Sequence, residues 1–320
     1  MRQTKCAMAF AIAISTLLFS GAARAEWPER PITLVAPYPP GGNADVMARL
    51  VGQSLGKRLG QTVVVENRPG AGGMVGSHYV VNAKPDGYTF LLGSIANSLY
   101  PYFIKNVPYD VKTDLVPVSH IVNVPNFFAV SPKSKFQSVP ALIEEAKKNP
   151  NAVSCGTTGV GTSTYLSCEL FKSKLGLKIT NVPYKGGVPA MTDVIGGQTT
   201  FVIANEVLPY AKDGRLNAIG VTSKEASPLA PQIKPISEII KDFDVVSWYG
   251  VFAPAKTDPA IVEKISSEIQ KVVQEDDVKK KMATIGATPV GSTPAEFKTY
   301  FDSEVDKWAR ETKAMNIRPN

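Results

Sequence analysis

The chain has 320 residues, of which 44% are hydrophobic and 20% are charged. This composition is typical of a globular protein and excludes a disordered or fibrous one, and the length is sufficient for two domains. The formal net charge is +7, but three cations lie in the first 25 residues, and without them 32 Lys and Arg stand against 28 Asp and Glu. That small surplus argues against nucleic acid as a partner and is compatible with a small anionic ligand.

The first 25 residues form a segment that is separate from the fold. Arg2 and Lys5 precede an apolar core at residues 7–19, and Ala23-Arg24-Ala25 follows it. This pattern predicts a secretory signal peptide that is cleaved after Ala25, and the apolar core is too short to span a bilayer. We therefore expect a soluble, periplasmic mature protein.

The stretch Pro37–Asp45 combines a strand end, a glycine turn and a helix start. It follows the apolar run 32–36 and precedes a helix with apolar residues at helical spacing. The first amides of a helix have no partner within the helix, and the helix dipole adds partial positive charge there. Because Gly41 and Gly42 let a ligand approach the backbone, the stretch predicts an anion site suited to a carboxylate. The alternative is an ordinary turn capped by Asn43.

Strand-like and helix-like segments alternate along the rest of the chain. Strands are expected at 62–66, 88–92, 152–155, 178–184, 201–204 and 216–221, and helices at 74–83, 139–148, 164–175 and 259–273. A capping box at Thr293–Glu296 predicts a last helix that closes the first domain. The alternation predicts doubly wound α/β domains, in which ligands sit at the carboxyl ends of strands.

Two longer strand-like passages are expected to cross between two such domains. They are Val118–Val130, which Pro125 interrupts, and Val245–Ala253. The expected fold class is therefore α/β, with two doubly wound lobes joined by two crossing strands and a ligand cleft between them. Lobe 1 is assigned to residues 26–124 and 249–320, and lobe 2 to residues 125–248.

The loop Gly156–Ser163 has the glycine spacing of a phosphate-binding loop. Thr162, however, stands where the phosphate-binding lysine should be, so ATP binding is not expected. A second glycine-rich helix start remains, with hydroxyl donors suited to a carboxylate, or a plain N-cap in the simpler interpretation. Gly70–Gly76 is a poor dinucleotide fingerprint because no acidic residue ends a following strand. We therefore expect no cofactor.

Catalytic and metal-binding patterns are absent from the sequence after the leader. It has two histidines, His78 and His120, in unrelated segments, and no G-x-S-x-G elbow, no His-x-x-x-His pair and no Cys-x-x-Cys. We expect no catalytic residues, no metal site and no enzyme. Cys155 ends a strand and Cys168 lies about two turns into the next helix, a poor match to the Cα separation of roughly 4.4–6.8 Å that a disulfide needs. Two buried thiols are expected instead.

Motifs spread over nearly the whole mature chain belong together. They are Trp27-Pro28, Pro37–Asp45, Glu66–Gly73, Pro85–Thr89, Val182–Gly187, Trp248–Gly250 and Gly291–Pro294. Together they resemble the extracytoplasmic solute receptors of tripartite tricarboxylate transporters, of the Bug/TctC type. The resemblance implies a type II periplasmic-binding-protein fold, a small carboxylate ligand, and cognate membrane transporter subunits as partners. A monomer is expected.

The resemblance also implies that loops of both lobes hold the carboxylate, partly through waters. The residues expected to bind the ligand are Tyr38, Gly41, Gly42, Asn43, Ser94, Asn97, Thr157, Thr158, Gly161, Thr162, Ser163 and Asn205. Asp45 and Asp193 match family positions that are expected to shape the loops. The segments 94–98 and 203–207 depart from the usual pattern at the variable end of the ligand, so the substrate class stays open.

The expected function is capture of a di-, tri- or aromatic carboxylate in the periplasm and its delivery to a tripartite tricarboxylate-type membrane transporter. Two alternatives remain open. One is an exported hydrolase or isomerase acting on a small carboxylate, which needs a nucleophile and a base in the cleft. The other is a solute sensor whose partner is a signalling receptor.

Overall fold

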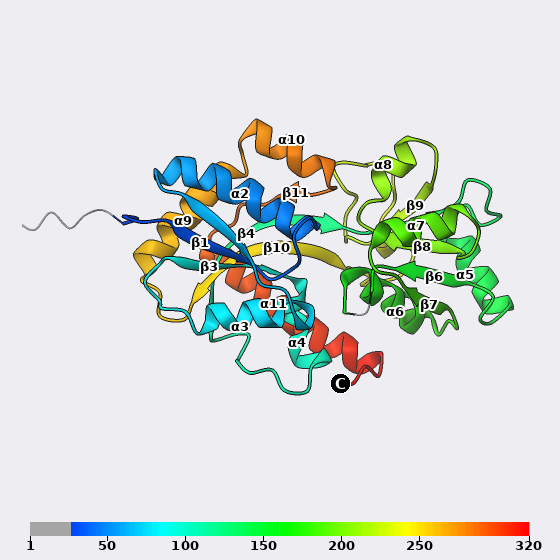
Figure 1. Cartoon of the computed structure of the whole chain (residues 1–320). Helices are drawn as coiled ribbons and strands as arrows, with labels where there is room; N and C mark the ends of the chain where they lie inside the picture. The colour runs from blue at the N-terminus through cyan, green and yellow to red at the C-terminus, as the bar shows by residue number, and fades with distance from the viewer. Residues whose placement is uncertain (1–26, 160, 320) are drawn as a thin grey trace, which may run out of the picture.

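The computed structural model describes residues 27–159 and 161–319, so the predicted signal peptide lies outside the described residues. Two β-sheets with helices packed around them form two lobes that lie side by side (Figure 1). The first sheet has six strands in the order β11-β4-β10-β3-β1-β2, and the second has five in the order β7-β6-β8-β5-β9. The predicted α/β class with two lobes is confirmed.

Lobe 1 is built on the six-stranded sheet. Its strands are β1 (Ile32–Ala36), β2 (Val63–Asn67), β3 (Thr89–Ser94), β4 (Leu115–Pro125), β10 (Val246–Pro254) and β11 (Thr288–Pro289), and its helices are α2 (Asn43–Leu59), α3 (Met74–Val81), α4 (Ile95–Phe103), α9 (Pro259–Val272), α10 (Asp276–Thr284) and α11 (Pro294–Ala314). β1 pairs in parallel with both β2 and β3, and β10 is antiparallel to β3 and β4. The parallel strands therefore end at one edge, where α2 and α4 begin.

Lobe 2 repeats this arrangement on a smaller scale. Its strands are β5 (Phe127–Val130), β6 (Ser154–Thr157), β7 (Thr180–Pro183), β8 (Phe201–Ala204) and β9 (Asn217–Val221), and its helices are α5 (Val139–Lys148), α6 (Ser163–Leu175), α7 (Gly187–Ile195) and α8 (Val207–Lys212). β6 pairs in parallel with β7 and β8. The loops that follow these three strands therefore lie at one edge of the second sheet.

The chain crosses between the lobes in the two predicted passages. β4 ends in the first sheet at Pro125, and β5 begins in the second sheet at Phe127. The return strand β10 pairs Val246 with Pro125, so both crossings lie next to each other (Figure 1). Asn126, between β4 and β5, makes two hydrogen bonds of 3.0 Å with Thr222. The Asn126 amide donates to the Thr222 hydroxyl, and the Thr222 amide donates to the Asn126 carbonyl.

The last helix closes lobe 1 as predicted. Thr293 and Glu296 form the capping box at the start of α11. Phe297 and Phe301 of this helix pack edge-on against Trp248 of β10, with ring centroids 5.7 and 6.0 Å apart. This aromatic cluster is buried and fixes the return crossing against the rest of lobe 1.

Candidate functional site

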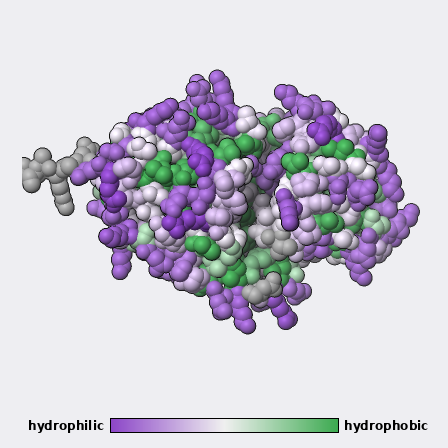
Figure 2. Space-filling view, viewed as in Figure 1, coloured by the Kyte–Doolittle hydropathy of each residue, from purple (hydrophilic) through white to green (hydrophobic). Residues whose placement is uncertain are grey.

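A cavity of about 640 Å³ lies between the lobes, and residues of both lobes line it. The surface is hollowed along this boundary (Figure 2). The volume lies within the range of small-molecule binding sites, which in two-lobed proteins form preferentially at the interface between domains. The cavity also lies where the loops after β1, β3, β6, β7 and β8 meet, as expected for ligand sites in α/β folds.

The start of α2 forms one wall of the cavity. Gly42 is the N-cap residue, it has extended backbone angles, and no side chain caps the helix. Asn43 is the first helical residue and does not act as the cap, so the simpler interpretation of this stretch as an Asn43-capped turn is wrong. Uncapped amides at a helix start can donate hydrogen bonds to an anion.

Hydrogen bonds to Asp45 fix the loop before α2. Its carboxylate accepts hydrogen bonds from the Gly41 amide (3.0 Å), the Asn67 side chain (2.8 Å) and the Arg49 guanidinium. The Arg49 guanidinium and the other donors lower the pKa of Asp45 to about 2. Gly41 has φ +88°, a left-handed conformation that suits glycine. The geometry therefore gives Asp45 the loop-shaping role that the sequence predicts.

Tyr38 and Ser94 form the next part of the wall, and their hydroxyl oxygens lie 2.6 Å apart. Burial raises the pKa of Tyr38, so its hydroxyl is neutral and can donate or accept. Ser94 caps α4, and the Asn97 side chain accepts from the Ser94 amide and donates to Ser77. Asn97 is thus part of a buried capping box and does not line the cavity.

The facing wall in lobe 2 carries hydroxyl groups. Thr162 is the N-cap of α6 and accepts from the Tyr165 amide, so the plain N-cap interpretation of this loop is correct as far as Thr162 is concerned. Thr158 and Thr162 also line the cavity, and the Thr158 hydroxyl lies 2.8 Å from that of Thr164. Thr157, one residue earlier, is fully buried and donates to Asn181 because successive strand residues point to opposite faces.

Nine of the twelve residues expected to bind ligand line the cavity. They are Tyr38, Gly42, Asn43, Ser94, Thr158, Gly161, Thr162, Ser163 and Asn205. Gly41, Asn97 and Thr157 do not line it. Asn97 supports Ser94, which does, while Gly41 donates to Asp45 and Thr157 donates to Asn181. The Asn205 amide group donates to Asn126 (2.7 Å) and to the carbonyls of Val124 and Pro125, so this residue also ties β8 to the crossing.

Sequence reasoning missed three polar side chains of the cavity, and the glycine that follows one of them. Lys185 and Gly186 follow β7, and Ser247 and Tyr249 lie on β10. The position of Lys185 after a strand parallel to β6 could have revealed it. Tyr249 pairs across the sheet with Ser94, and burial raises the pKa of its hydroxyl. No signal in the sequence places β10 next to β3.

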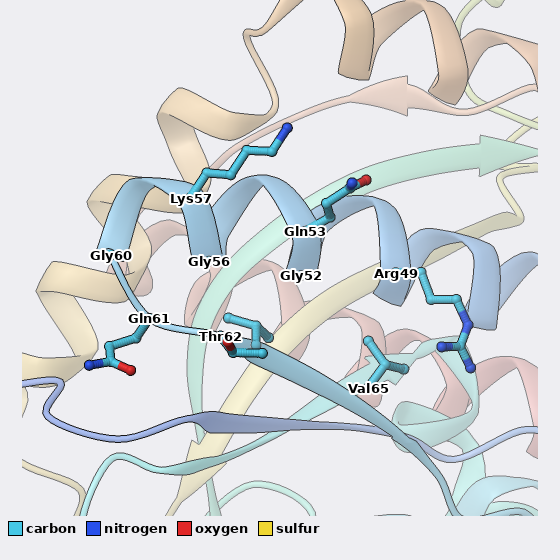
Figure 3. A pocket seen from close by; sticks show the side chains of 10 residues that line it. Arg49, Gly52, Gln53, Gly56, Lys57, Gly60, Gln61, Thr62 and Val65 are labelled. Atoms are coloured by element: carbon cyan, nitrogen blue, oxygen red, sulfur yellow. The ribbon is translucent and has the colours of Figure 1, made fainter.

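A second groove, of about 680 Å³, runs along α2 and the edge strand β2 (Figure 3). Gly52 and Gly56 lie in it because helix and strand pack closely there: a Cβ on Gly56 would lie 2.9 Å from the Gln61 carbonyl oxygen. None of the residues expected to bind ligand lines this groove. The glycines are explained by packing, and the cleft between the lobes is the candidate site.

The histidines do not contribute to the cleft. His120 is buried and stacks on Tyr300 with ring centroids 4.5 Å apart, and His78 stacks on Tyr109. In residues 27–159 and 161–319, no group of three or more His, Cys, Asp or Glu side chains could hold a metal ion. Within the same ranges, no helix combines the length and apolarity needed to cross a bilayer.

An α/β protein with two lobes, two adjacent crossings and a cavity between them has the periplasmic-binding-protein fold of type II. The sequence model described as "Tripartite tricarboxylate transporter family receptor" matches residues 47–317, and the chain belongs to this family. The resemblance seen in the sequence motifs is thereby confirmed.

Named relatives agree with this assignment over nearly the whole chain. Protein BugT of Bordetella pertussis is 36% identical, over 98% of this chain and 99% of its own. The R. palustris protein Rpa4515, solved with adipate, is 32% identical with a TM-score of 0.81, over 92% of this chain and 100% of its own. MatC from Rhodopseudomonas palustris, solved with bound malate, is 26% identical with a TM-score of 0.75, over 89% of this chain and 100% of its own.

Proposed function

We propose that the chain is a periplasmic receptor that captures an organic carboxylate in the cleft and delivers it to a tripartite tricarboxylate-type membrane transporter. The observation that carries the proposal is the uncapped start of α2 at Gly42, which faces the hydroxyl-bearing loop of lobe 2 across one cavity. The adipate and malate found in two solved relatives support a carboxylate as the ligand.

The ligand carboxylate is held in this proposal by uncharged donors from both lobes. The amides at the start of α2 supply hydrogen bonds from lobe 1, and the Thr158 hydroxyl supplies one from lobe 2. The hydroxyls of Thr162 and Ser163 donate to the Gly159 carbonyl and to Asn126, and they hold this wall in place. Hydrogen bonds to a charged acceptor are stronger than neutral ones, and water-mediated contacts add to them. Because the donors come from both lobes, closure brings them together and the ligand stabilises the closed form.

Capture without chemical conversion fits the residues that line the cavity. Its side chains include hydroxyls, amides and Lys185, but neither histidine, so the described cavity offers no nucleophile paired with an imidazole base. We further propose that the chain is exported with cleavage after Ala25 and acts as a monomer. A sensor for a signalling receptor would use the same cleft and differ in its membrane partner.

A melting-temperature screen tests the proposal. Mono-, di- and tricarboxylates, aromatic acids and acidic amino acids are added to the mature protein, each beside its uncharged amide as a control. A ligand that binds only the folded state raises the melting temperature in a concentration-dependent manner. At a ligand concentration one hundred times the Kd, the free energy of unfolding increases by about 2.7 kcal/mol. At least one carboxylate, and none of the amides, is expected to do so. No response to any carboxylate refutes the proposal.

A further inference from the structure

The charge on the cavity wall is concentrated in one side chain. Among the described residues that line the cavity, Lys185 is the only Asp, Glu, Lys or Arg. The side chain is exposed, and no ion pair to it is found within residues 27–159 and 161–319. The other polar groups of the wall are hydroxyls, amides and backbone groups.

The backbone of Lys185 is held firmly at the carboxyl end of β7. The preceding Tyr184 donates its backbone amide to the Thr157 carbonyl (2.8 Å) and its hydroxyl to the Asp193 carboxylate (2.7 Å). Gly186 follows with φ +116°, which turns the chain into α7. The ammonium therefore moves on a flexible stem from a fixed base at the cavity.

A wall of neutral donors cannot by itself distinguish a ligand with one carboxylate from a ligand with two. The first carboxylate is satisfied at the start of α2, whereas a second one enclosed by lobe closure needs its own partner. A buried carboxylate without such a partner is strongly disfavoured, and an ammonium within reach removes that penalty. Lys185 is the cation that the cavity provides for this purpose.

From this arrangement we infer that Lys185 binds a second carboxylate of the ligand, so that the cleft selects dicarboxylates over monocarboxylates of the same length. The inference rests on the proposed function, since it requires a first carboxylate at Gly42. It places ligand discrimination in the loop between β7 and α7, in addition to the segments around Ser94 and Asn205.

Asp193 is engaged by the Tyr184 hydroxyl, so Glu206, which lies beside Gly187, is the acidic group to compare with Lys185 as a partner for the ligand. Its Oε2 is buried without a hydrogen-bond partner among the described residues, and an added Cβ on Gly187 would clash with it. Burial raises the pKa of Glu206. Glu206 does not line the cavity, whereas Lys185 does. The second charged group of the ligand is therefore expected to be an anion that pairs with Lys185, and not an ammonium that pairs with Glu206.

Calorimetric titration with ligands matched in length tests the inference. The probes are succinate, butyrate and 4-aminobutyrate, and adipate, hexanoate and 6-aminohexanoate. The proteins are the wild type, Lys185→Gln, Lys185→Arg and Glu206→Gln. Lys178→Gln is the matched control, because Lys178 is also exposed and precedes the other end of β7.

For Lys185→Gln we expect the affinity for the dicarboxylate to fall at least about tenfold, the scale of a hydrogen bond between charged groups. The affinity for the monocarboxylate should change less than about twofold, a difference below the scale of one hydrogen bond. Lys185→Arg should retain most of the dicarboxylate affinity. Lys178→Gln and Glu206→Gln should bind dicarboxylates and monocarboxylates with the same affinities as the wild type. Added NaCl should weaken dicarboxylate binding more in the wild type than in Lys185→Gln.

Three results overturn the inference. The first is an unchanged dicarboxylate affinity in Lys185→Gln, and the second is an equal loss for monocarboxylates and dicarboxylates. The third is tighter binding of the ω-amino acids than of the dicarboxylates, together with a loss of this affinity in Glu206→Gln. That result would show that Glu206 binds an ammonium group of the ligand. In each case the wild type still binds a carboxylate, so the proposed function stands. Absence of binding by any probe to the wild type refutes both.

Discussion

The Asp45 carboxylate accepts a hydrogen bond of 3.0 Å from the backbone amide of Gly41, four residues before it in the chain. Arg49 and Asn67 donate to the same carboxylate. The loop that presents Gly42 to the cavity is therefore fixed before any ligand arrives. A preformed loop lowers the entropy cost of binding.

Replacing Asp45 by Asn should destabilise the protein and weaken ligand binding. The pKa of Asp45 is about 2 in the fold, below the ordinary value of 3.8, so the carboxylate stabilises the fold above about pH 4. That contribution is lost as the pH falls through 2. Solvent screens the ion pair because Arg49 is half-exposed. We therefore expect the Asp45 carboxylate to contribute about 1–2 kcal/mol to the free energy of unfolding at pH 7.

Urea unfolding of the wild type and Asp45→Asn at pH 7 and near pH 2.5 measures this difference. Asp86→Asn is the control, because the Asp86–Arg30 ion pair lies on the surface and contributes less than about 1 kcal/mol. A gap between wild type and Asp45→Asn that is equally large at both pH values contradicts the account.

His120 should make the fold less stable in mild acid. Burial lowers the pKa of His120 to about 4, while its Nε2–H donates to the Val122 carbonyl. Above about pH 6.5 the imidazole is neutral in both states and has no effect. Between about pH 6.5 and 4 the unfolded chain binds a proton that the folded chain does not, so stability falls by up to about 1.4 kcal/mol per pH unit.

The variant His120→Phe removes this proton linkage and keeps an aromatic ring against Tyr300 and Phe297. Its free energy of unfolding should decline less between pH 7 and 4.5 than that of the wild type. His78→Phe serves as the control for loss of a histidine elsewhere. Identical pH profiles of the wild type and His120→Phe would show that His120 is not kept neutral by burial.

The features that followed from local sequence were predicted well. The break at Pro125 marks the first crossing, and Gly42 is an uncapped helix start, because strand ends and turns depend on residues next to each other in the chain. The last helix was predicted from its capping box, and the buried strands from their short apolar runs, for the same reason.

The residues that sequence reasoning misplaced depend on orientation or on distant pairing. Thr157 and Thr158 have similar side chains, and only the alternation at the end of β6 directs one to Asn181 and the other to the cavity. Asn97 occupies the fourth position of a capping box, a pattern that could have been recognised. Tyr249 reaches the site because β10 pairs with β3, which no local pattern encodes.

Cys155 and Cys168 should behave as protected free thiols. Both are buried and unbonded in the fold, as the sequence predicts, and burial raises the pKa of the Cys155 thiol. A thiol with a raised pKa and no access to solvent reacts slowly. Ellman's reagent should therefore detect almost no thiol in the native protein and two per chain in guanidinium chloride, in the mature protein without its leader. Two reactive thiols in the native protein, or none after unfolding, contradict this prediction.

Gly42 offers the sharpest separation of binding from folding. Its backbone is extended at φ −82°, and an added Cβ would meet only the Pro39 carbonyl oxygen, at 3.9 Å. The fold therefore has room for a Cβ at this position, and a valine places its branched side chain at the start of α2, where the carboxylate is proposed to bind. Gly41 has φ +88°, so Gly41→Val should lose stability and is the contrasting variant.

Titration calorimetry of the wild type and Gly42→Val with the tightest carboxylate from the screen shows whether the start of α2 binds the ligand. We predict one site per chain in the wild type. In Gly42→Val we predict a loss of affinity of roughly a hundredfold or more, because several charge-assisted hydrogen bonds are blocked. The circular dichroism spectrum should be unchanged, and the melting temperature without ligand should fall only slightly, because valine is a poorer N-cap than glycine. Equal affinities in the two proteins would contradict the claim that the start of α2 binds the carboxylate.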